Sequence, residues 1–272
     1  MRLLNVKPDK TWSFALAALP FLALLGAYVI GSDMRLAENP NDKLLPSFGA
    51  MAEAFKHMAL QPDPRSGIYL MWNDTLSSLS LLLTALAIST LIALVFGILI
   101  GMLPIMNATF GPMVAVASMV PPLALLPILF IVMGLGDAAK IALIVIGTTL
   151  KLTRDMALRV QDLPREQLIK AQTLGASTWQ IGTRVVLPQM LPRLIDTVRL
   201  ELGPAWLFLI AAEAIAADAG LGYRIFLVRR YLAMDVIIPY VIWITLLAFL
   251  MDLALRLLQR RAFPWFAGAR EA

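Results

Sequence analysis

The chain has 272 residues, of which 60% are hydrophobic and only 15% are charged, and its mean hydropathy is +0.78. A soluble domain of this length would carry more charge, so the composition predicts an all-α polytopic membrane protein. With no cysteine and a single histidine, His57, the chain lacks the residues for disulfides, thiolate catalysis or a cysteine- or histidine-based metal centre. The net charge of +5 is explained better by basic cytoplasmic loops than by nucleic-acid binding.

Six apolar stretches have the length of membrane-spanning helices. In chain order they cover residues 12–31, 76–103, 111–133, 138–156, 197–217 and 236–258. Basic residues precede the first stretch and follow the last, which predicts a multi-pass membrane protein with both termini in the cytoplasm. The outer loop 218–235 holds three arginines against this rule, and we interpret it as a partly embedded or interfacial segment.

The first two spans are separated by a polar segment, residues 32–75, which we place on the periplasmic side. Ser47 is a plausible N-cap within it, and apolar residues follow at helical spacing, so a short interfacial helix is expected there. The predicted organisation is an N-terminal segment with the first span (1–31), this periplasmic segment, a core transmembrane domain (76–260) and a cytoplasmic tail (261–272).

Prolines interrupt the third span. Pro121 and Pro122 are adjacent and Pro127 follows, and each removes a backbone donor from the helix. This span is therefore expected to kink or break near mid-membrane. We expect a short turn at residues 104–109 before it and an outer turn at 134–140 after it.

Ionisable residues inside spans usually face a cavity or a partner, because a bare charge is costly in lipid. Glu213, near the outer end of the fifth span, is expected to pair with Arg224 or Arg229, either to support gating or only to fix the outer loop. Lys151 and Arg154 could serve an anionic substrate or simply anchor their helix at the inner surface, and the sequence leaves both explanations open.

Two further acids lie nearer the inner ends of their spans. Glu201 is expected to pair with Arg199 or Arg154. Asp252 is expected to pair with Arg256, four residues later on the same helix. Both pairs are interpreted as structural.

A polar elbow, residues 159–192, follows the fourth span on the cytoplasmic side. Glu166 and Lys170 have the i,i+4 spacing that favours a helix, and Gly175 is suited to the left-handed cap that would end it. A second helix is expected to begin at Ser177, which has the capping-box spacing to Gln180.

This second helix is expected to end near Pro188, and Pro192 is expected to begin the next element. Leu168, Ala171, Leu174 and Trp179 give the elbow an apolar edge. Such an edge is typical either of an amphipathic loop resting on lipid headgroups or of a docking surface for a partner.

The elbow resembles the cytoplasmic loop of permease subunits of ATP-binding-cassette (ABC) importers. That loop reads Glu-Ala-Ala, then three residues, Gly, nine residues, and Ile-x-Leu-Pro. The matching positions, with their spacing intact, are Ala171, Gly175, Leu187 and Pro188. Ile169 and Lys170 stand where the family has Glu and its first Ala, and Glu166 lies one helical turn earlier on the same face.

Other stretches are similar to permeases of the nitrate, sulfonate, taurine and bicarbonate group, namely 191–226, the proline-rich third span with the helix after it, and 45–55. The resemblance implies a MetI-like fold of the type I ABC importers and about six transmembrane helices. It implies an ATPase-coupling surface at Glu166, Lys170, Ala171, Gly175, Ala176, Trp179, Leu187 and Pro188. The translocation path is expected to include Pro121, Pro122, Thr148, Thr149, Trp206 and Glu213.

The implied function is to move a small solute into the cytoplasm, either an anion like nitrate, sulfonate, taurine or bicarbonate or a small nitrogen or sulfur compound. The chain shows no phosphate-binding loop, so ATP and Mg²⁺ are expected on a partner, and we expect no catalytic residue, metal or cofactor in the chain itself. The implied partners are a second permease, most simply an identical copy, two ABC ATPases, a periplasmic or lipid-anchored binding protein and membrane lipids, but no nucleic acid.

Two other classes of membrane protein were weighed against this interpretation. An ion-driven secondary transporter would be expected to show repeated halves, and no internal symmetry is evident in the sequence. A membrane-embedded enzyme would need a nucleophile with a base nearby or a cluster of carboxylates or histidines. The secondary transporter remains the main alternative.

Overall fold

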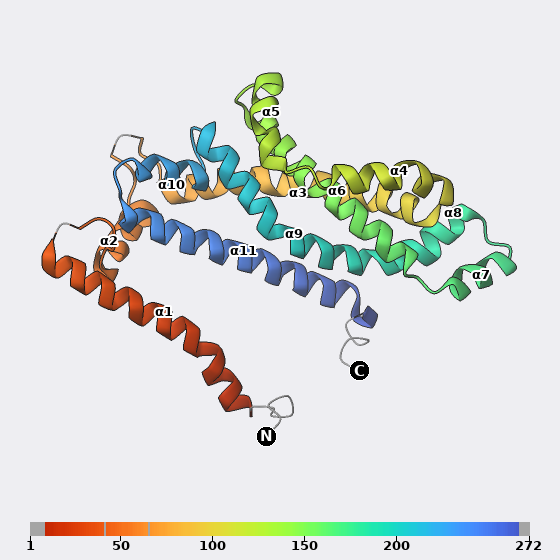
Figure 1. The fold of residues 1–272 in the computed structure, drawn as a ribbon, viewed down its shortest axis with the longest axis horizontal. Helices are drawn as coiled ribbons and strands as arrows, with labels where there is room; N and C mark the ends of the chain where they lie inside the picture. The colour runs from red at the N-terminus through yellow and green to blue at the C-terminus, as the bar shows by residue number, and fades with distance from the viewer. Residues whose placement is uncertain (1–8, 41, 65, 267–272) are drawn as a thin grey trace. The chain divides into compact units, whose positions relative to one another are not determined.

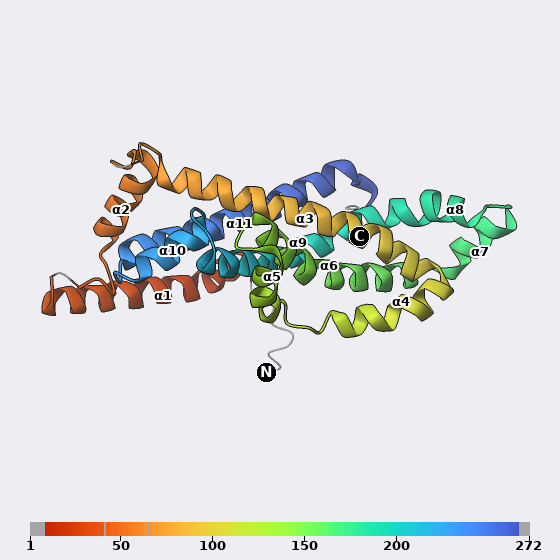
Figure 2. The same cartoon turned by 90° about the horizontal axis from the view of Figure 1, so that it is seen from above.

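The computed structural model describes residues 9–40, 42–64 and 66–266, and their regular structure is helical throughout (Figures 1 and 2). Within these residues the prediction of an all-α protein is confirmed. The helices group into two compact units. Unit 1 combines the part of the chain up to Tyr69 with Val228–Val241, and unit 2 combines Leu70–Leu227 with the part from Ile242 onward.

Unit 1 contains the first helix, α1 (Lys10–Glu38), and the short helix α2 (Phe48–Leu60). The predicted N-cap of α2 is confirmed, because the Ser47 hydroxyl accepts a hydrogen bond from the Ala50 amide at 3.2 Å. Helix α1 continues past the predicted end of the first span at Gly31.

Side chains from the last three turns of α1 bind the loop that leads to α2. Tyr28 donates to the carbonyl of Pro46 at 2.6 Å, and Ser32 donates to the carbonyl of Leu45 at 2.9 Å. Arg35 forms an ion pair with Asp42, and this guanidinium lowers the pKa of the Asp42 carboxyl below its ordinary value. These bonds give the polar turns of α1 partners, which explains why the helix extends beyond the apolar run.

Unit 2 holds the remaining helices. They are α3 (Leu70–Met102), α4 (Pro104–Ala117), η2 (Pro122–Leu125), α5 (Leu126–Met133), α6 (Asp137–Gln161), α7 (Arg165–Thr173), α8 (Thr178–Ile181), the π-helical turn η3 (Gly182–Val186) and α9 (Leu187–Ile215). Helices α10 (Leu221–Arg229) and α11 (Met234–Ala262) follow, each with a part in both units. Most of the outer loop predicted at 218–235 is therefore helical.

The prediction for the third span is wrong where the span begins and correct at its internal break. The turn expected at 104–109 is wrong, because Leu103 alone is extended and Pro104 begins α4 directly. Proline suits this first helical position, where its missing donor costs nothing. The expected break at Pro121 and Pro122 is confirmed, since α4 and the η2–α5 segment meet at a bend of 82°.

Three helices, α1, α3 and α11, are long and apolar enough to cross a membrane, and the bent pair of α4 with η2–α5 counts as a fourth. Helices α6 and α9 have the length but carry charged residues in their middle turns. Both helices pack against other helices of unit 2, which shields much of their surface from lipid. The six membrane spans expected from the sequence therefore require that neighbouring helices shield α6 and α9 from lipid.

The most extensive helix contact in unit 2 joins α3 to α6, and glycine allows the two helices to approach closely. A Cβ atom at Gly97 would lie 2.5 Å from the Cβ of Met156, and one at Gly101 would lie 2.7 Å from the carbonyl oxygen of Ala157. Small residues let helix backbones approach closely inside a membrane. Gly97 and Gly101 have this role on α3.

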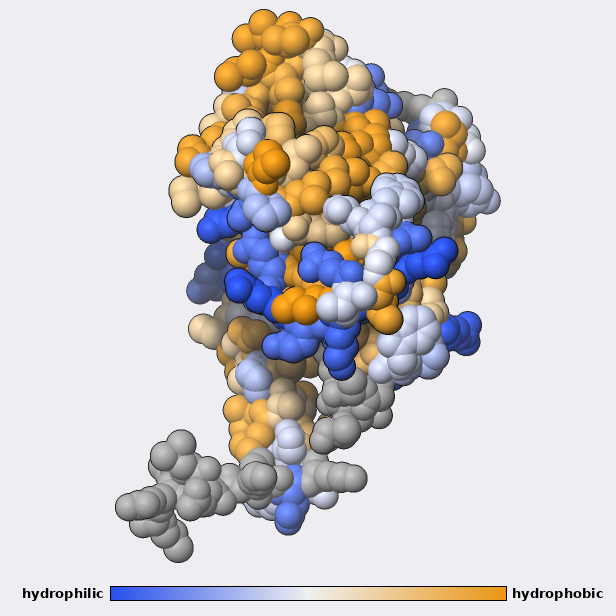
Figure 3. All heavy atoms as spheres, turned by 90° about the vertical axis from the view of Figure 1, so that its right-hand side faces the viewer, coloured by the Kyte–Doolittle hydropathy of each residue, from blue (hydrophilic) through white to orange (hydrophobic). Residues whose placement is uncertain are grey.

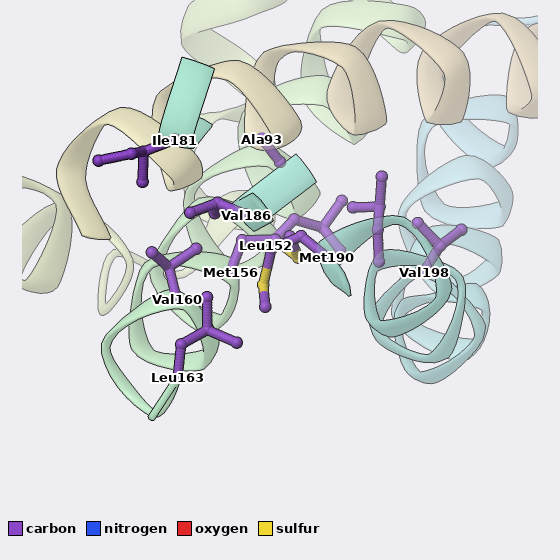
Figure 4. Packing of buried hydrophobic residues seen from close by; sticks show 10 residues of the cluster. Ala93, Leu152, Met156, Val160, Leu163, Ile181, Val186, Met190 and Val198 are labelled. Carbon is purple, nitrogen blue, oxygen red and sulfur yellow. The ribbon is translucent and has the colours of Figure 1, made fainter. Parts of the chain in front are cut away.

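An apolar core extends this contact toward the polar elbow (Figure 4). It is formed by side chains from α3, α6, α8, η3 and α9, together with Leu163 after α6. The buried members are Ala93, Leu152, Met156, Val160, Leu163, Ile181, Val186, Met190, Leu194 and Val198. The elbow is therefore built onto the core of unit 2.

The α3–α6 contact makes a direct prediction. Gly101→Ala should force the two backbones apart and lower the free energy of unfolding by about 1–3 kcal/mol, the usual cost of overpacking. The measurement is the melting temperature of the purified protein in detergent. Gly203→Ala on α9 is the matched control, because nothing lies within 4 Å of its new methyl group. Equal melting temperatures for both variants would contradict the close contact.

Candidate functional site

The first helix of the elbow ends in a fully bonded left-handed cap. Gly175 has φ +78°, its amide donates to the carbonyl of Gln172 at 2.9 Å, and the Ala176 amide donates to the carbonyl of Ala171 at 3.0 Å. These two bonds define a Schellman motif, in which the positive φ favours glycine. The predicted cap at Gly175 is confirmed.

The second helix of the elbow begins with a reciprocal cap. The Ser177 hydroxyl accepts from the Gln180 amide at 3.3 Å, while the Gln180 side chain accepts from the Ser177 amide at 2.8 Å. The predicted capping box is therefore confirmed. The N-cap Ser177 directly follows Ala176, the last residue of the Schellman motif, so little of the turn is free to flex.

The far end of the elbow differs from the prediction. The second helix does not end near Pro188, and Pro192 does not begin a new element, because α8, η3 and α9 follow one another without a break. Pro188 lacks a backbone donor, and the π turn of Gly182–Val186 directly precedes it. The wider turn lets the helix pass the proline, so the elbow continues as one rod into α9.

Inward-facing side chains fix the elbow to unit 2. Leu168, Ala171 and Ala176 pack against the core shown in Figure 4. Gln189 at the start of α9 also donates to the side chain of Gln167 on α7 at 3.0 Å. The predicted apolar edge is thus divided, because Leu168 and Ala171 serve internal packing.

The rest of the apolar edge faces outward. Leu174 is 88% exposed, Trp179 is 77% exposed, and Ile169 is 55% exposed. Glu166 and Lys170 are exposed as well. Figure 3 looks onto the side that carries α7 and α8, where hydrophilic side chains gather with apolar ones among them. A large exposed tryptophan in a polar, capped turn is typical of a protein-binding surface.

The last two residues of the predicted coupling surface are Leu187 and Pro188. Both are half-buried at the start of α9. The structure therefore brings the predicted coupling residues together on α7, the following turn and α8, and places these two on the rod that carries the elbow.

The predicted path residues fall into separate places. Pro121 and Pro122 form the break, and a Cβ at Gly147 of α6 would lie 3.1 Å from Pro122. Thr148 is fully buried and donates to the Ser89 hydroxyl of α3 at 2.8 Å, so it joins two helices. The hydroxyl of Thr149 and the indole nitrogen of Trp206 are buried without a hydrogen bond among the described residues.

Glu213 lies in a buried polar network between α3, α9 and α10. Its carboxylate accepts from the Ser78 hydroxyl at 2.7 Å and from the Gly222 amide at 2.8 Å. Gly220 has φ +127°, and a Cβ there would lie 2.6 Å from the Glu213 carboxyl carbon. The glycines of the Gly-Leu-Gly sequence thus allow the turn to close around this acid.

A second buried acid completes the network and was missed by sequence reasoning. Asp74 on α3 accepts from Arg224 at 2.8 Å and from the Gly220 amide at 3.1 Å, and it is fully buried. The predicted pairing of Arg224 with Glu213 is therefore wrong. Sequence analysis had placed Asp74 in the periplasmic segment, although its spacing of four from Ser78 could have shown that both belong to one helix face.

Charges also pair between α9 and α11 and within α11. Arg199 donates to Asp252 at 2.6 Å, and Arg256 donates to Asp252 at 2.8 Å, so the predicted Asp252–Arg256 pair is confirmed. The predicted pairing of Glu201 with Arg199 or Arg154 is wrong, because Arg199 uses Asp252 and Asp196, and Arg154 donates to Ser118. One buried oxygen of Glu201 has no hydrogen bond among the described residues.

A broken third span and a capped polar elbow are the features of a class of membrane protein, the permease subunit of an ABC transporter. The chain belongs to the family described as binding-protein-dependent transport system inner membrane component, whose model matches residues 93–264. The resemblance stated from the sequence is confirmed.

Curated relatives agree with this family. The chain is 35% identical to the taurine transport system permease protein TauC of Escherichia coli over 72% of this chain and 71% of that protein. It is 34% identical to a putative aliphatic sulfonates transport permease protein, SsuC, of E. coli over 54% and 56% of the two chains. It is 30% identical to the bicarbonate transport system permease protein CmpB of Synechococcus elongatus over 70% and 69%.

A solved structure of the same fold is the inward-facing MetNI methionine ABC transporter. The match has a TM-score of 0.64 at 20% identity and covers 73% of this chain and 99% of that chain. The MetI-like fold predicted from the sequence is therefore confirmed, and at this identity the likeness concerns the fold.

The Glu213 network predicts a specific loss of stability. Glu213→Ala leaves the Ser78 hydroxyl and the Gly222 amide without their acceptor, which should cost about 1–3 kcal/mol per unsatisfied group. Hydrogen exchange of residues 218–229 should rise, and the melting temperature in detergent should fall.

The control for this variant is Glu53→Ala, which removes an exposed acid from α2. Glu213→Gln keeps one acceptor oxygen and should show an intermediate effect. An unchanged melting temperature and unchanged exchange in Glu213→Ala would contradict the network.

Proposed function

We propose that this chain is the permease subunit of an importer that uses ATP hydrolysed by a partner to carry a small anion, such as a sulfonate or bicarbonate, into the cytoplasm. The observation that carries the proposal is the elbow: two capped helices, fixed to the core on one side and presenting Leu174 and Trp179 on the other. An importer of this kind needs a rigid cytoplasmic joint, since a flexible loop would absorb motion from the ATPase.

The proposed ATPase-coupling surface consists of the exposed residues of the elbow. It comprises Glu166, Lys170, Gly175 and Trp179, with Ala171 and Ala176 holding the turn beneath them and Leu187 and Pro188 at its base. Trp179 is the expected anchor, because large aromatic side chains that become buried carry much of the binding energy at protein interfaces. Charged Glu166 and Lys170 would select the partner and its orientation.

The proposed cargo follows from the relatives. The similar permeases are named for taurine, aliphatic sulfonates and bicarbonate, which are small molecules with an anionic group. We place the path beside the break at Pro121 and Pro122, where the unbonded polar atoms of Thr149 and Trp206 lie on the flanking helices α6 and α9. Thr148 and Glu213 would shape the path by holding α6 and α10 to α3.

The proposed assembly contains two copies of this chain, two ABC ATPases and a periplasmic or lipid-anchored binding protein that delivers the cargo. A single bundle of about six helices is too small to enclose a path comfortably. In this arrangement ATP and Mg²⁺ belong to the ATPase. Both termini and the elbow would lie in the cytoplasm, with residues 32–75 outside and 76–260 as the core transmembrane domain.

The role of the elbow is tested by Trp179→Ala. Truncating an interface anchor typically costs about 2 kcal/mol or more, which is roughly a 30-fold weaker affinity. The transporter should be purified from native membranes through a tag on this chain, and the ATPase activity that co-purifies should fall sharply in the variant.

The matched control is Trp12→Ala, which removes a tryptophan that is 66% exposed on α1. Because Trp179 makes little contact within the chain, the melting temperature of the permease itself should not change. Full co-purification of ATPase activity with Trp179→Ala would overturn the proposed docking surface.

A further inference from the structure

Helix α6 carries four basic residues, of which two form ion pairs with acids and two do not. Lys140 pairs with Asp137 at 2.9 Å, and Arg159 pairs with Asp155 at 2.6 Å. Lys151 and Arg154 form no ion pair within 4.0 Å of any acid among the described residues. These two cations lie three residues apart, so they occupy neighbouring positions on one face of the helix.

The surroundings hold Lys151 in place without neutralising its charge. Its ammonium lies 5.9 Å from the centre of the Phe208 ring of α9. Phe208 is itself fixed, since a Cβ at Gly147 would lie 2.5 Å from this ring and 3.1 Å from Pro122 at the helix break. No side-chain hydrogen bond from the Lys151 ammonium to the described residues is found, so its three donors are left for another ligand.

Arg154 continues the same face toward the other side of the break. Its guanidinium donates to the Ser118 hydroxyl at 3.4 Å, just after the end of α4. Ser118 lines a cavity of about 270 Å³ beside the break, together with Pro122 and Gly147. The two cations, which have no ion pair among the described residues, are therefore linked to the wall of this cavity through their neighbours. Arg154 reaches it through Ser118, and Lys151 lies beside Phe208, whose ring packs against Gly147.

A cation inside a spanning segment usually faces a partner or a polar path, because lipid cannot solvate it. Anchoring to headgroups is a common alternative near the end of a helix, but Lys151 lies ten residues, or roughly 15 Å, before the end of α6 at Gln161. Its side chain is also turned toward Phe208 of α9.

We infer that Lys151 and Arg154 form an anion-binding site on the translocation path, with Lys151 as the main contact for the anionic group of the cargo and Arg154 as the second. The ligand is a small oxyanion of the sulfonate or carboxylate type. The inference rests on the proposed function and adds the residues that would recognise the cargo inside the membrane. A lipid phosphate has the same chemistry and is the competing source of the anion.

The test uses the complete transporter, purified with its ATPase and binding protein and placed in liposomes of phosphatidylcholine and phosphatidylglycerol. ATP-dependent uptake of radiolabelled taurine, methanesulfonate and bicarbonate is measured. Lys151→Gln should lower the uptake of the transported anion by about tenfold or more, as expected for the loss of a hydrogen bond to a charged group, and Arg154→Gln should lower it less. Lys151→Arg keeps the charge and should stay within about threefold of the wild type.

The control is Arg256→Gln, which removes a cation that pairs with Asp252 outside this site. Arg256→Gln should leave uptake and basal ATP hydrolysis unchanged. The melting temperature and co-purification of the ATPase are compared for all four variants, which separates loss of cargo binding from loss of folding. Normal uptake by Lys151→Gln, with wild-type uptake present, would overturn the inference and leave the proposed function standing. Absence of ATP-dependent uptake of all three anions by the wild type would overturn both.

A second arm distinguishes cargo from lipid. The wild type and Lys151→Gln are compared in liposomes with and without phosphatidylglycerol. A cargo site predicts the same relative loss of uptake in both lipid mixtures. A loss that occurs only when phosphatidylglycerol is present would identify a lipid headgroup as the ligand and would contradict the inference.

Discussion

The structure depends on how tightly the elbow is bonded to the helix that carries it. The Schellman motif at Gly175 and the capping box at Ser177 satisfy the backbone groups of the turn, so that α7 and α8 meet with only four residues between them, from Leu174 to Ser177. Leu168 and Ala171 pack the elbow against the core, and η3 joins it to α9 without a break. A displacement applied at Trp179 would therefore move α9 as a rod.

The same rod leads to the buried network at the other end of α9. Glu213 bonds to α3 through Ser78 and to the first turn of α10 through Gly222. Asp74 and Arg224 close this network from the other side, and the Glu213–Ser78 bond is lost if α9 slides relative to α3. In the proposed importer, the elbow and this network are the two ends of a single lever, and the broken third span lies beside its middle.

Much of this could be predicted from the sequence, because the signals were local. The caps at Ser47, Gly175 and Ser177 follow from residue type and spacing over a few positions, and the break at Pro121 follows from the chemistry of proline. The pairings of buried charges could not be predicted in the same way. Arg224 pairs with Asp74, 150 residues earlier in the chain, and such a choice depends on which helices pack together.

The misplaced ends of elements have a related cause. The turn expected at 104–109 is helical, since a single extended residue at Leu103 reverses the chain. The helix expected to stop at Pro188 continues, because a π turn accommodates the proline. In both cases a backbone adjustment of a few residues replaced the longer loop that composition favours. The direction in which Leu174 and Trp179 point was also set by tertiary packing of their neighbours on the elbow.

The absence of cysteine allows the most direct measurement of the central claim, that the elbow docks on an ATPase. A single thiol introduced by Leu174→Cys, at a side chain that is 88% exposed, can be crosslinked in native membranes with a short bifunctional reagent. The account predicts a crosslink to an ATP-hydrolysing subunit whose yield changes when ATP is added, and none from Phe14→Cys on α1. If Leu174→Cys gave no such crosslink, or one only to lipid, the elbow would not be the joint that drives transport.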